Sequence, residues 1–161
     1  AQQDMVQIDR YALIMMRRLQ EKVAGELYPR YAFHHATQEI VSFCSEELGA
    51  FYLDILKDRL YTTPAKSLAR RSAQTALYHI TRSLLLLISP ILCFTAEEAW
   101  EVFTGSDEDS VLYHTWHEFP AMDGEEVAEL ERKWENIRQV RLAANKEIEV
   151  FPKAFCKSRC G

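Results

Sequence analysis

Basic side chains gather in one part of this sequence, where they could neutralise an anionic polymer. Between residues 57 and 82 the chain has six basic residues and one acidic residue, Asp58. The basic residues are Lys57, Arg59, Lys66, Arg70, Arg71 and Arg82. A stripe of Lys and Arg is typical of proteins that bind the phosphate backbone of a nucleic acid. We therefore take these six residues as candidates for nucleic-acid binding, with a solvated helix face as the alternative.

Three tyrosines lie in or near the basic stripe and could contact bases. Proteins bind single-stranded RNA with cations on its phosphates and with aromatic or Arg side chains stacked on splayed bases. Tyr52, Tyr61 and Tyr78 are the aromatic candidates. We expect some of them to be buried, because tyrosine often packs its ring in a core and leaves its hydroxyl in water.

The charge of the chain is strongly polarised along the sequence. The net charge is −5, but residues 97–131 contain twelve Asp and Glu and no Lys or Arg. The remainder holds 19 basic and 12 acidic residues, a net charge of +7. We expect the acidic span to face away from RNA, and it would also suit contacts with other protein domains.

Other pairs of reactive side chains favour structural roles over catalytic ones. Asp54 and Asp58 share a helix face and could do acid–base chemistry, but ion pairs with Arg70 or Arg71 fit their basic surroundings better. His34 and His35 are adjacent, so on a helix they point about 100° apart and cannot share one metal ion. A glycine-rich, phosphate-binding loop is also missing from the sequence. We therefore expect no catalytic residue and no metal site.

Hydrophobic periodicity predicts an all-α fold, an antiparallel bundle of about five helices with short connections. Ser67 is the expected N-cap of the third helix, and Thr95 with Glu98 forms an expected capping box for the fourth. Gly49 lies within the second helix, where it could let a neighbouring helix approach closely. The expected helices cover residues 4–27, 33–61, 68–88, from 95 onward, and 125–149, with residues 111–113 extended.

The expected apolar stripe of the second helix is continuous, and the end of the chain differs in composition. The stripe comprises Phe33, Ala36, Ile40, Cys44, Leu48, Phe51 and Ile55. We expect Cys44 and Cys93 to be small core residues in a protein of the reducing cytosol. Residues 1–150 should form the bundle. Residues 151–161, FPKAFCKSRCG, form a tail that we expect to be disordered or vector-derived.

Several ordered blocks of sequence resemble one family. Over about residues 5–116 the chain is similar to the anticodon-binding helical domain of bacterial isoleucyl-tRNA synthetases, which are class I enzymes. The blocks are DRYALIMMRRLQ (9–20), YAFHHATQEIVSFC (31–44), FYLDILKDRLYT (51–62), RRSAQTALYHI (70–80), SPILCFTAEEAW (89–100) and HTWHEFP (114–120).

This resemblance implies a helical module that binds the anticodon stem-loop of isoleucine tRNA. The parent enzyme would ligate isoleucine to that tRNA with ATP and Mg, in a catalytic domain elsewhere in the same parent chain. The family's HIGH-like and KMSKS-like motifs are absent from this sequence, so we expect the piece to be inactive alone and to bind no cofactor. We expect a cytoplasmic monomer without membrane contact. The alternatives are the equivalent domain of valyl-tRNA synthetase, or a helical scaffold that contacts only protein.

Overall fold

The computed structural model of the chain describes the backbone of residues 5–157 and the side chains of residues 5–148. Every regular element in the described part is a helix, so the all-α prediction is confirmed. The chain divides into two compact units, Ala1–Ala121 and Met122–Gly161, which are described separately. Within the described residues, none of the helices combines the length and the hydrophobicity that a membrane-spanning segment needs.

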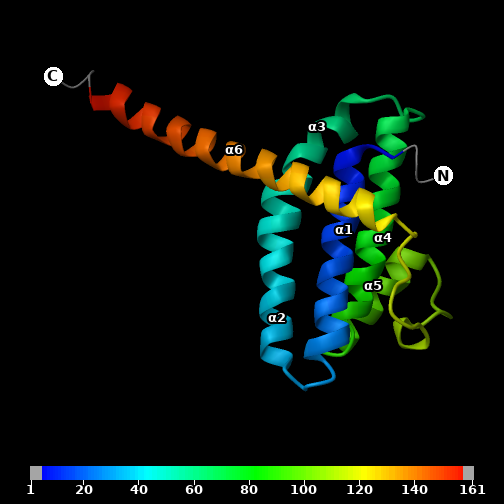
Figure 1. Cartoon of the computed structure of the whole chain (residues 1–161). Coiled ribbons are helices and arrows are strands. Elements are labelled where there is room, and N and C mark those ends of the chain that lie inside the picture. Colours follow the sequence, from blue (N-terminus) through cyan, green and yellow to red (C-terminus); the bar gives the residue numbers. More distant parts are fainter. Residues whose placement is uncertain (1–4, 158–161) are drawn as a thin grey trace. The chain divides into compact units, whose positions relative to one another are not determined.

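The first unit is built on three long helical rods, which are α1, the continuous run from α2 to α3, and α4. They lie side by side (Figure 1). The helix α1 packs against α4, and α2 continues through a π-helical segment into α3, which also contacts α4. The shorter α5 packs against α4. The bounds are α1 Gln7–Lys22, α2 Phe33–Ser42, α3 Asp54–Thr62, α4 Leu68–Ile88 and α5 Cys93–Thr104.

The second rod is continuous, as predicted, but its middle is a π-helix. This segment, η3, covers Phe43–Leu53, and a shorter one, η2 at Val23–Leu27, extends α1. In a π-helix each backbone hydrogen bond joins residues five apart. The 3.6-residue spacing of buried side chains in an α-helix therefore no longer holds. Phe43, three residues after Ile40, is buried in place of the predicted Cys44. Beyond the π-helical segment the buried stripe lies one position later than predicted, at Leu56 in place of Ile55.

The prediction that Cys44 and Cys93 are core residues is wrong, because both are exposed. Cys44 is exposed because Phe43, the residue before it, takes the inward position. Cys93 is the first residue of α5, ahead of the helix face that packs inward. Ala96 and Trp100 lie on that face and are fully buried.

The ends of the helices agree only in part with the expected caps. Ser67 caps α4, since its side-chain oxygen accepts a hydrogen bond from the backbone N–H of Arg70 at 3.2 Å. The expected capping box at Thr95 is wrong, because α5 begins two residues earlier and has no side-chain cap. Residues 111–113 are not extended but form a turn of 3₁₀-helix, η4 (Val111–Tyr113).

Glu97 fixes the loop that follows α5. Its carboxylate accepts hydrogen bonds from the Ser110 hydroxyl at 3.0 Å and from the Val111 backbone N–H at 3.1 Å. Val111 then packs into a small apolar cluster with Leu86 and Trp100. The acidic residue within α5 thus positions the loop that leads to residues 114–118.

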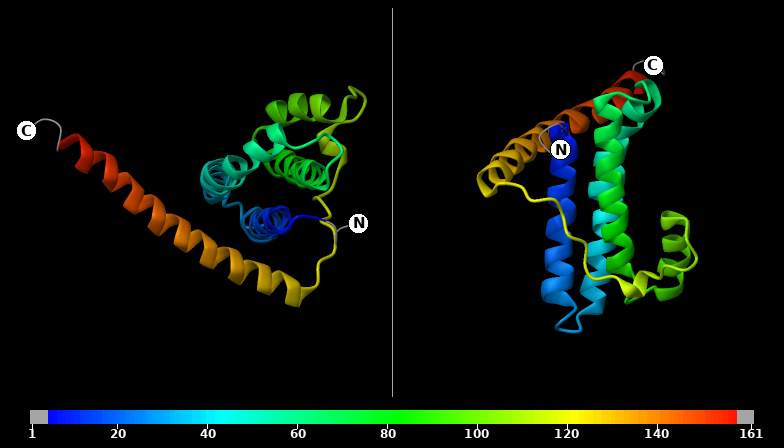
Figure 2. Two further views of the ribbon diagram at one scale, coloured as in Figure 1. Left: turned by 90° about the horizontal axis from the view of Figure 1, so that it is seen from above. Right: turned by 90° about the vertical axis from the view of Figure 1, so that its right-hand side faces the viewer.

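The second unit is one long helix, α6, which covers Gly124–Lys157 (Figure 2). It continues past the expected end near residue 149, so the backbone of residues 151–157 is helical. Residues 158–161 of the expected tail lie outside the described residues. The division at residue 150 and the origin of the tail remain predictions.

Gly49 has a different role from the one expected, because no other helix of the described residues has an atom within 4 Å of the place where its Cβ would lie. A Cβ atom at this position would lie 3.0 Å from the backbone carbonyl oxygen of Cys44 in the same π-helical segment. A Cβ atom at Gly25, in η2, would meet nothing within 4 Å. An alanine at position 49 would therefore need a shift of a few tenths of an ångström in the backbone of this segment.

We predict opposite outcomes for two Gly→Ala substitutions in the π-helical segments. Gly25→Ala should raise the free energy of unfolding by about 0.5–1 kcal/mol, because alanine restricts the unfolded chain and meets no obstacle. Gly49→Ala should leave it unchanged or lower it, because the contact with Cys44 offsets that gain. Urea denaturation followed by circular dichroism measures both. An equal gain at the two sites would contradict the π-helical geometry of η3.

Candidate nucleic-acid interface

The turn between α3 and α4 presents exposed basic side chains at one end of the first unit. Lys66 lies in the turn and Arg71 in the first turn of α4, and both are exposed. Arg70 is half-buried, and its Nη1 lies 3.4 Å from the carbonyl oxygen of Thr63, to which it donates. Together with the cap by Ser67, this contact holds the turn against the start of α4.

Lys57 lies on α3 next to this turn and forms an ion pair within its own helix. Its Nζ lies 2.8 Å from Oδ1 of Asp54, and both side chains are exposed. The hydrogen bond with Asp54 raises the pKa of Lys57. The expected pairing of Asp54 with Arg70 or Arg71 is wrong, because a lysine three residues along the same helix is within easier reach.

Arg59 points into the bundle, where it pairs with a buried carboxylate. Asp9 of α1 has no exposed surface and accepts hydrogen bonds from Arg59 Nη2, the Ser72 hydroxyl and the Tyr52 hydroxyl, the last at 2.8 Å. Ser72 also accepts from the backbone N–H of Val6 at 2.9 Å. Because its guanidinium is bound to Asp9, we leave Arg59 out of the proposed interface.

The three candidate tyrosines have different environments. Tyr52 is fully buried, and its burial, with the Asp9 carboxylate beside it, raises the pKa of its phenol. Tyr78 is half exposed, and its ring stacks on Phe103 with centroids 5.2 Å apart. Tyr61, at the end of α3, is 88% exposed and lies next to the basic turn. Tyr61 is therefore the candidate best placed to stack on a base.

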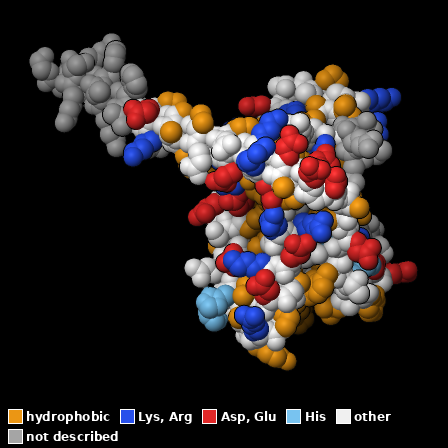
Figure 3. Space-filling view, viewed as in Figure 1, with side chains coloured by type: hydrophobic (Ala, Val, Ile, Leu, Met, Phe, Trp, Pro, Cys, Tyr) orange, Lys and Arg blue, Asp and Glu red, His pale blue; other side chains and the backbone are white. Residues whose placement is uncertain are grey.

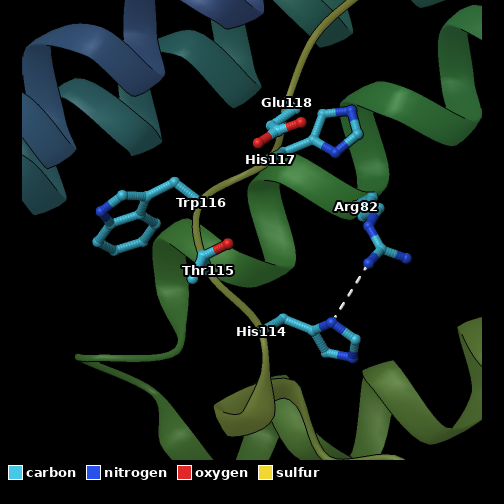
Figure 4. A pocket seen from close by; sticks show the side chains of 6 residues that line it. All are labelled: Arg82, His114, Thr115, Trp116, His117 and Glu118. Carbon is cyan, nitrogen blue, oxygen red and sulfur yellow. Dashed lines mark hydrogen bonds between the residues drawn. The ribbon is translucent and has the colours of Figure 1, made fainter.

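Arg82 lies apart from the other candidates. It is eleven residues beyond Arg71 on α4, a separation of about 16 Å along the helix axis. Its guanidinium lies over the ring of Trp100, 5.0 Å from the ring centroid, and its Nη2 is 3.4 Å from Nδ1 of His114 (Figure 4). The six basic residues thus divide among the turn, the interior and a separate site on α4.

Sequence reasoning missed the histidines around Arg82. His79 of α4 and His117 face each other with ring nitrogens 2.9 Å apart, and His114 lies beside Arg82. The motif HTWHEFP placed two of these histidines close together, but nothing in the sequence located α4 next to them. His34 and His35 are exposed, with ring centroids 3.9 Å apart. The described residues contain no group of three or more potential metal ligands.

The face of the bundle drawn in Figure 3 mixes basic and acidic side chains. Lys22 of α1 pairs with Glu39 of α2 at 2.6 Å, and Arg17 pairs with Glu21 at 2.9 Å. Such exposed pairs neutralise one another and contribute little to stability. The cations of the turn between α3 and α4 differ from these paired cations. Lys66 and Arg71 have no ion pair with another described residue.

Comparison with known proteins identifies the fold family. Residues 9–157 match the family described as the anticodon-binding domain of tRNA ligase. The chain belongs to this family. The resemblance seen in the sequence is therefore confirmed, and the match includes residues 151–157 of the expected tail.

Relatives of this anticodon-binding domain carry the name isoleucine–tRNA ligase. The chain is 70% identical over 148 residues to the protein of Neisseria meningitidis serogroup C (strain 053442) and 66% identical over 151 residues to that of Chromobacterium violaceum. It is 56% identical over 151 residues to that of Laribacter hongkongensis. These matches cover 92%, 94% and 94% of the chain but only 16% of each relative.

We predict that Arg59 and Lys57, two basic residues of α3, respond differently to substitution. Arg59→Gln should lower the free energy of unfolding by about 3 kcal/mol or more, because it leaves the buried Asp9 charge without its cation. Lys57→Gln should change it little, because that ion pair is exposed to solvent. Urea denaturation checks both, and equal effects would contradict a structural role for Arg59.

Proposed function

We propose that this chain is the tRNA-binding helical domain of an isoleucine–tRNA ligase and that its α3–α4 turn contacts the anticodon stem-loop. Family membership and the names of the relatives support the domain assignment. The observation that carries the placement is the exposure of Lys66 and Arg71 beside the exposed ring of Tyr61.

Binding at this turn would be mainly electrostatic. Lys57, Lys66, Arg70 and Arg71 bring four positive charges, and Asp54 and Asp58 bring two negative ones, which leaves +2. The N-terminus of α4 adds partial positive charge from its backbone N–H groups. These charges would hold the phosphates of an RNA loop while Tyr61 stacks on a base.

The parent protein, in this proposal, ligates isoleucine to its tRNA with ATP and Mg in the cytoplasm. The chemistry would take place in the catalytic domain of the same chain, and the monomeric piece described here would bind tRNA without catalysis. The rival function, a domain of a valine enzyme, is disfavoured by the isoleucine–tRNA ligase relatives. The other alternative, a helical scaffold that contacts only protein, is separated from this proposal by the tRNA titration that follows.

We predict salt-dependent and tRNA-selective binding by the chain. Isoleucine tRNA should bind more tightly than valine tRNA in a fluorescence anisotropy titration. Affinity decreases as salt increases, so the slope of log affinity against log salt is negative. Each phosphate contact that is lost should make this slope less steep by about 0.7–0.9. Lys66→Gln and Arg71→Gln should each make the slope less steep by this amount. Arg17→Gln is the matched control, because Arg17 is an exposed cation that pairs with Glu21 on α1.

Two results would contradict the proposal. No binding of either tRNA at low salt would favour the scaffold. An unchanged slope in both turn variants would remove the turn from the interface.

A further inference from the structure

A pocket of about 300 Å³ opens in the first unit between α4 and residues 114–118. Figure 4 shows the guanidinium of Arg82 facing this segment, with the rings of His114 and His117 on the same side. The Trp116 indole points away from them. The lining residues are Arg82, His114, Thr115, Trp116, His117 and Glu118.

The guanidinium of Arg82 is held in place from two directions. It lies over Trp100, whose indole N–H donates to Asp109 at 3.1 Å, and it contacts His114 Nδ1. Because arginine can only donate, Nδ1 accepts, and Nε2 of His114 donates to Asp109 at 2.9 Å. The ring of contacts from Arg82 through His114 and Asp109 to Trp100 therefore fixes the position of the positive charge.

Most of the hydrogen-bonding capacity of Arg82 is unused within the described residues. A guanidinium has five N–H donors. The described residues offer Arg82 one hydrogen-bond contact, the 3.4 Å contact to His114. None of its nitrogens is among the buried polar atoms without a partner, so the other donors are open to solvent or to the pocket. A fixed, half-buried guanidinium with open donors matches the geometry of a phosphate group.

We propose that this pocket binds a phosphate group, with the guanidinium of Arg82 as the main donor and the Thr115 hydroxyl as a second donor. Glu118 lines the same pocket, and its negative charge opposes an anion there. The phosphate is either a backbone phosphodiester of RNA or a free phosphate monoester. Only the RNA source rests on the proposed function, and the site is separate from the α3–α4 turn.

Phosphate binding should be linked to protonation of His117. Burial first, and then the charges of His79 and Arg82, lower the pKa of His117 to about 4, and burial and Arg82 lower that of His79. An anion beside Arg82 offsets its repulsion of a proton and so raises the pKa of His117. Binding of an anion whose own charge is constant in this range, such as sulfate or a phosphodiester, should therefore strengthen as the pH falls from neutral toward 4. Glu118 and His114 are the other titratable groups that line the pocket.

The test is an NMR titration of the histidine rings of the whole 161-residue chain with inorganic phosphate and, separately, with a short single-stranded oligoribonucleotide. We expect saturable shifts of His114 and His117 with inorganic phosphate. Arg82→Gln should weaken phosphate binding at least about tenfold, because a charge-assisted hydrogen bond is lost. Glu118→Gln should tighten it by about two- to threefold, because an opposing charge is removed. The matched control, Arg17→Gln, should have no effect.

Two further measurements keep the proposal testable if Arg82→Gln does not fold. Thr115→Val should weaken binding severalfold, and sulfate, which does not titrate near neutral pH, should raise the pKa of His117 in the unaltered chain. Shifts that do not saturate, or affinities unaffected by Thr115→Val and Glu118→Gln, would overturn the proposal.

Control experiments separate this pocket from the turn. The Lys66→Gln, Arg71→Gln double variant should keep its affinity for inorganic phosphate even if its tRNA binding is lost. Pocket shifts with the oligoribonucleotide would identify RNA as the source, and shifts with inorganic phosphate alone would identify a free phosphate. Loss of phosphate binding in the double variant would overturn the assignment to the pocket.

Discussion

The buried carboxylate of Asp9 sets the arrangement of the first unit. A charge without exposed surface is tolerated only where hydrogen bonds and a counter-ion replace water. Tyr52, Arg59 and Ser72 supply these contacts from three separate elements, η3, α3 and α4. Asp9 can therefore be satisfied only when α1, the second rod and α4 lie together.

This requirement also determines which cations remain at the surface. Arg59 points into the bundle and donates to Asp9, as does the hydroxyl of Tyr52 in the π-helical segment. Lys66 and Arg71, on either side of the Ser67 cap, have no such buried partner and remain exposed. The same packing thus separates the basic residues that stabilise the bundle from those available to a ligand.

The sequence alone predicted where the helices begin and end better than which of their residues are buried. The bounds of α4 and its Ser67 cap followed from local patterns, because they depend on neighbouring residues. The shift from Ile55 to Leu56 could not be predicted, since the π-helix before them breaks the spacing from which burial is inferred. The position of Arg59 could not be predicted either. Its partner, Asp9, is 50 residues away in the chain, and charge counting does not show which cations turn inward.

The separation of these partners along the chain has a consequence for the order of folding. The groups that donate to Asp9 follow it by 43, 50 and 63 residues. During synthesis, α1 can form early as a local structure, but its carboxylate has no native donor until Tyr52 has been made, and the last donor, Ser72, comes only with the start of α4. Closing such long loops is entropically unfavourable before the contacts form. Docking of α1 should therefore be completed late in folding, and an incomplete chain that ends before α4 would leave in water the part of α1 that packs on α4.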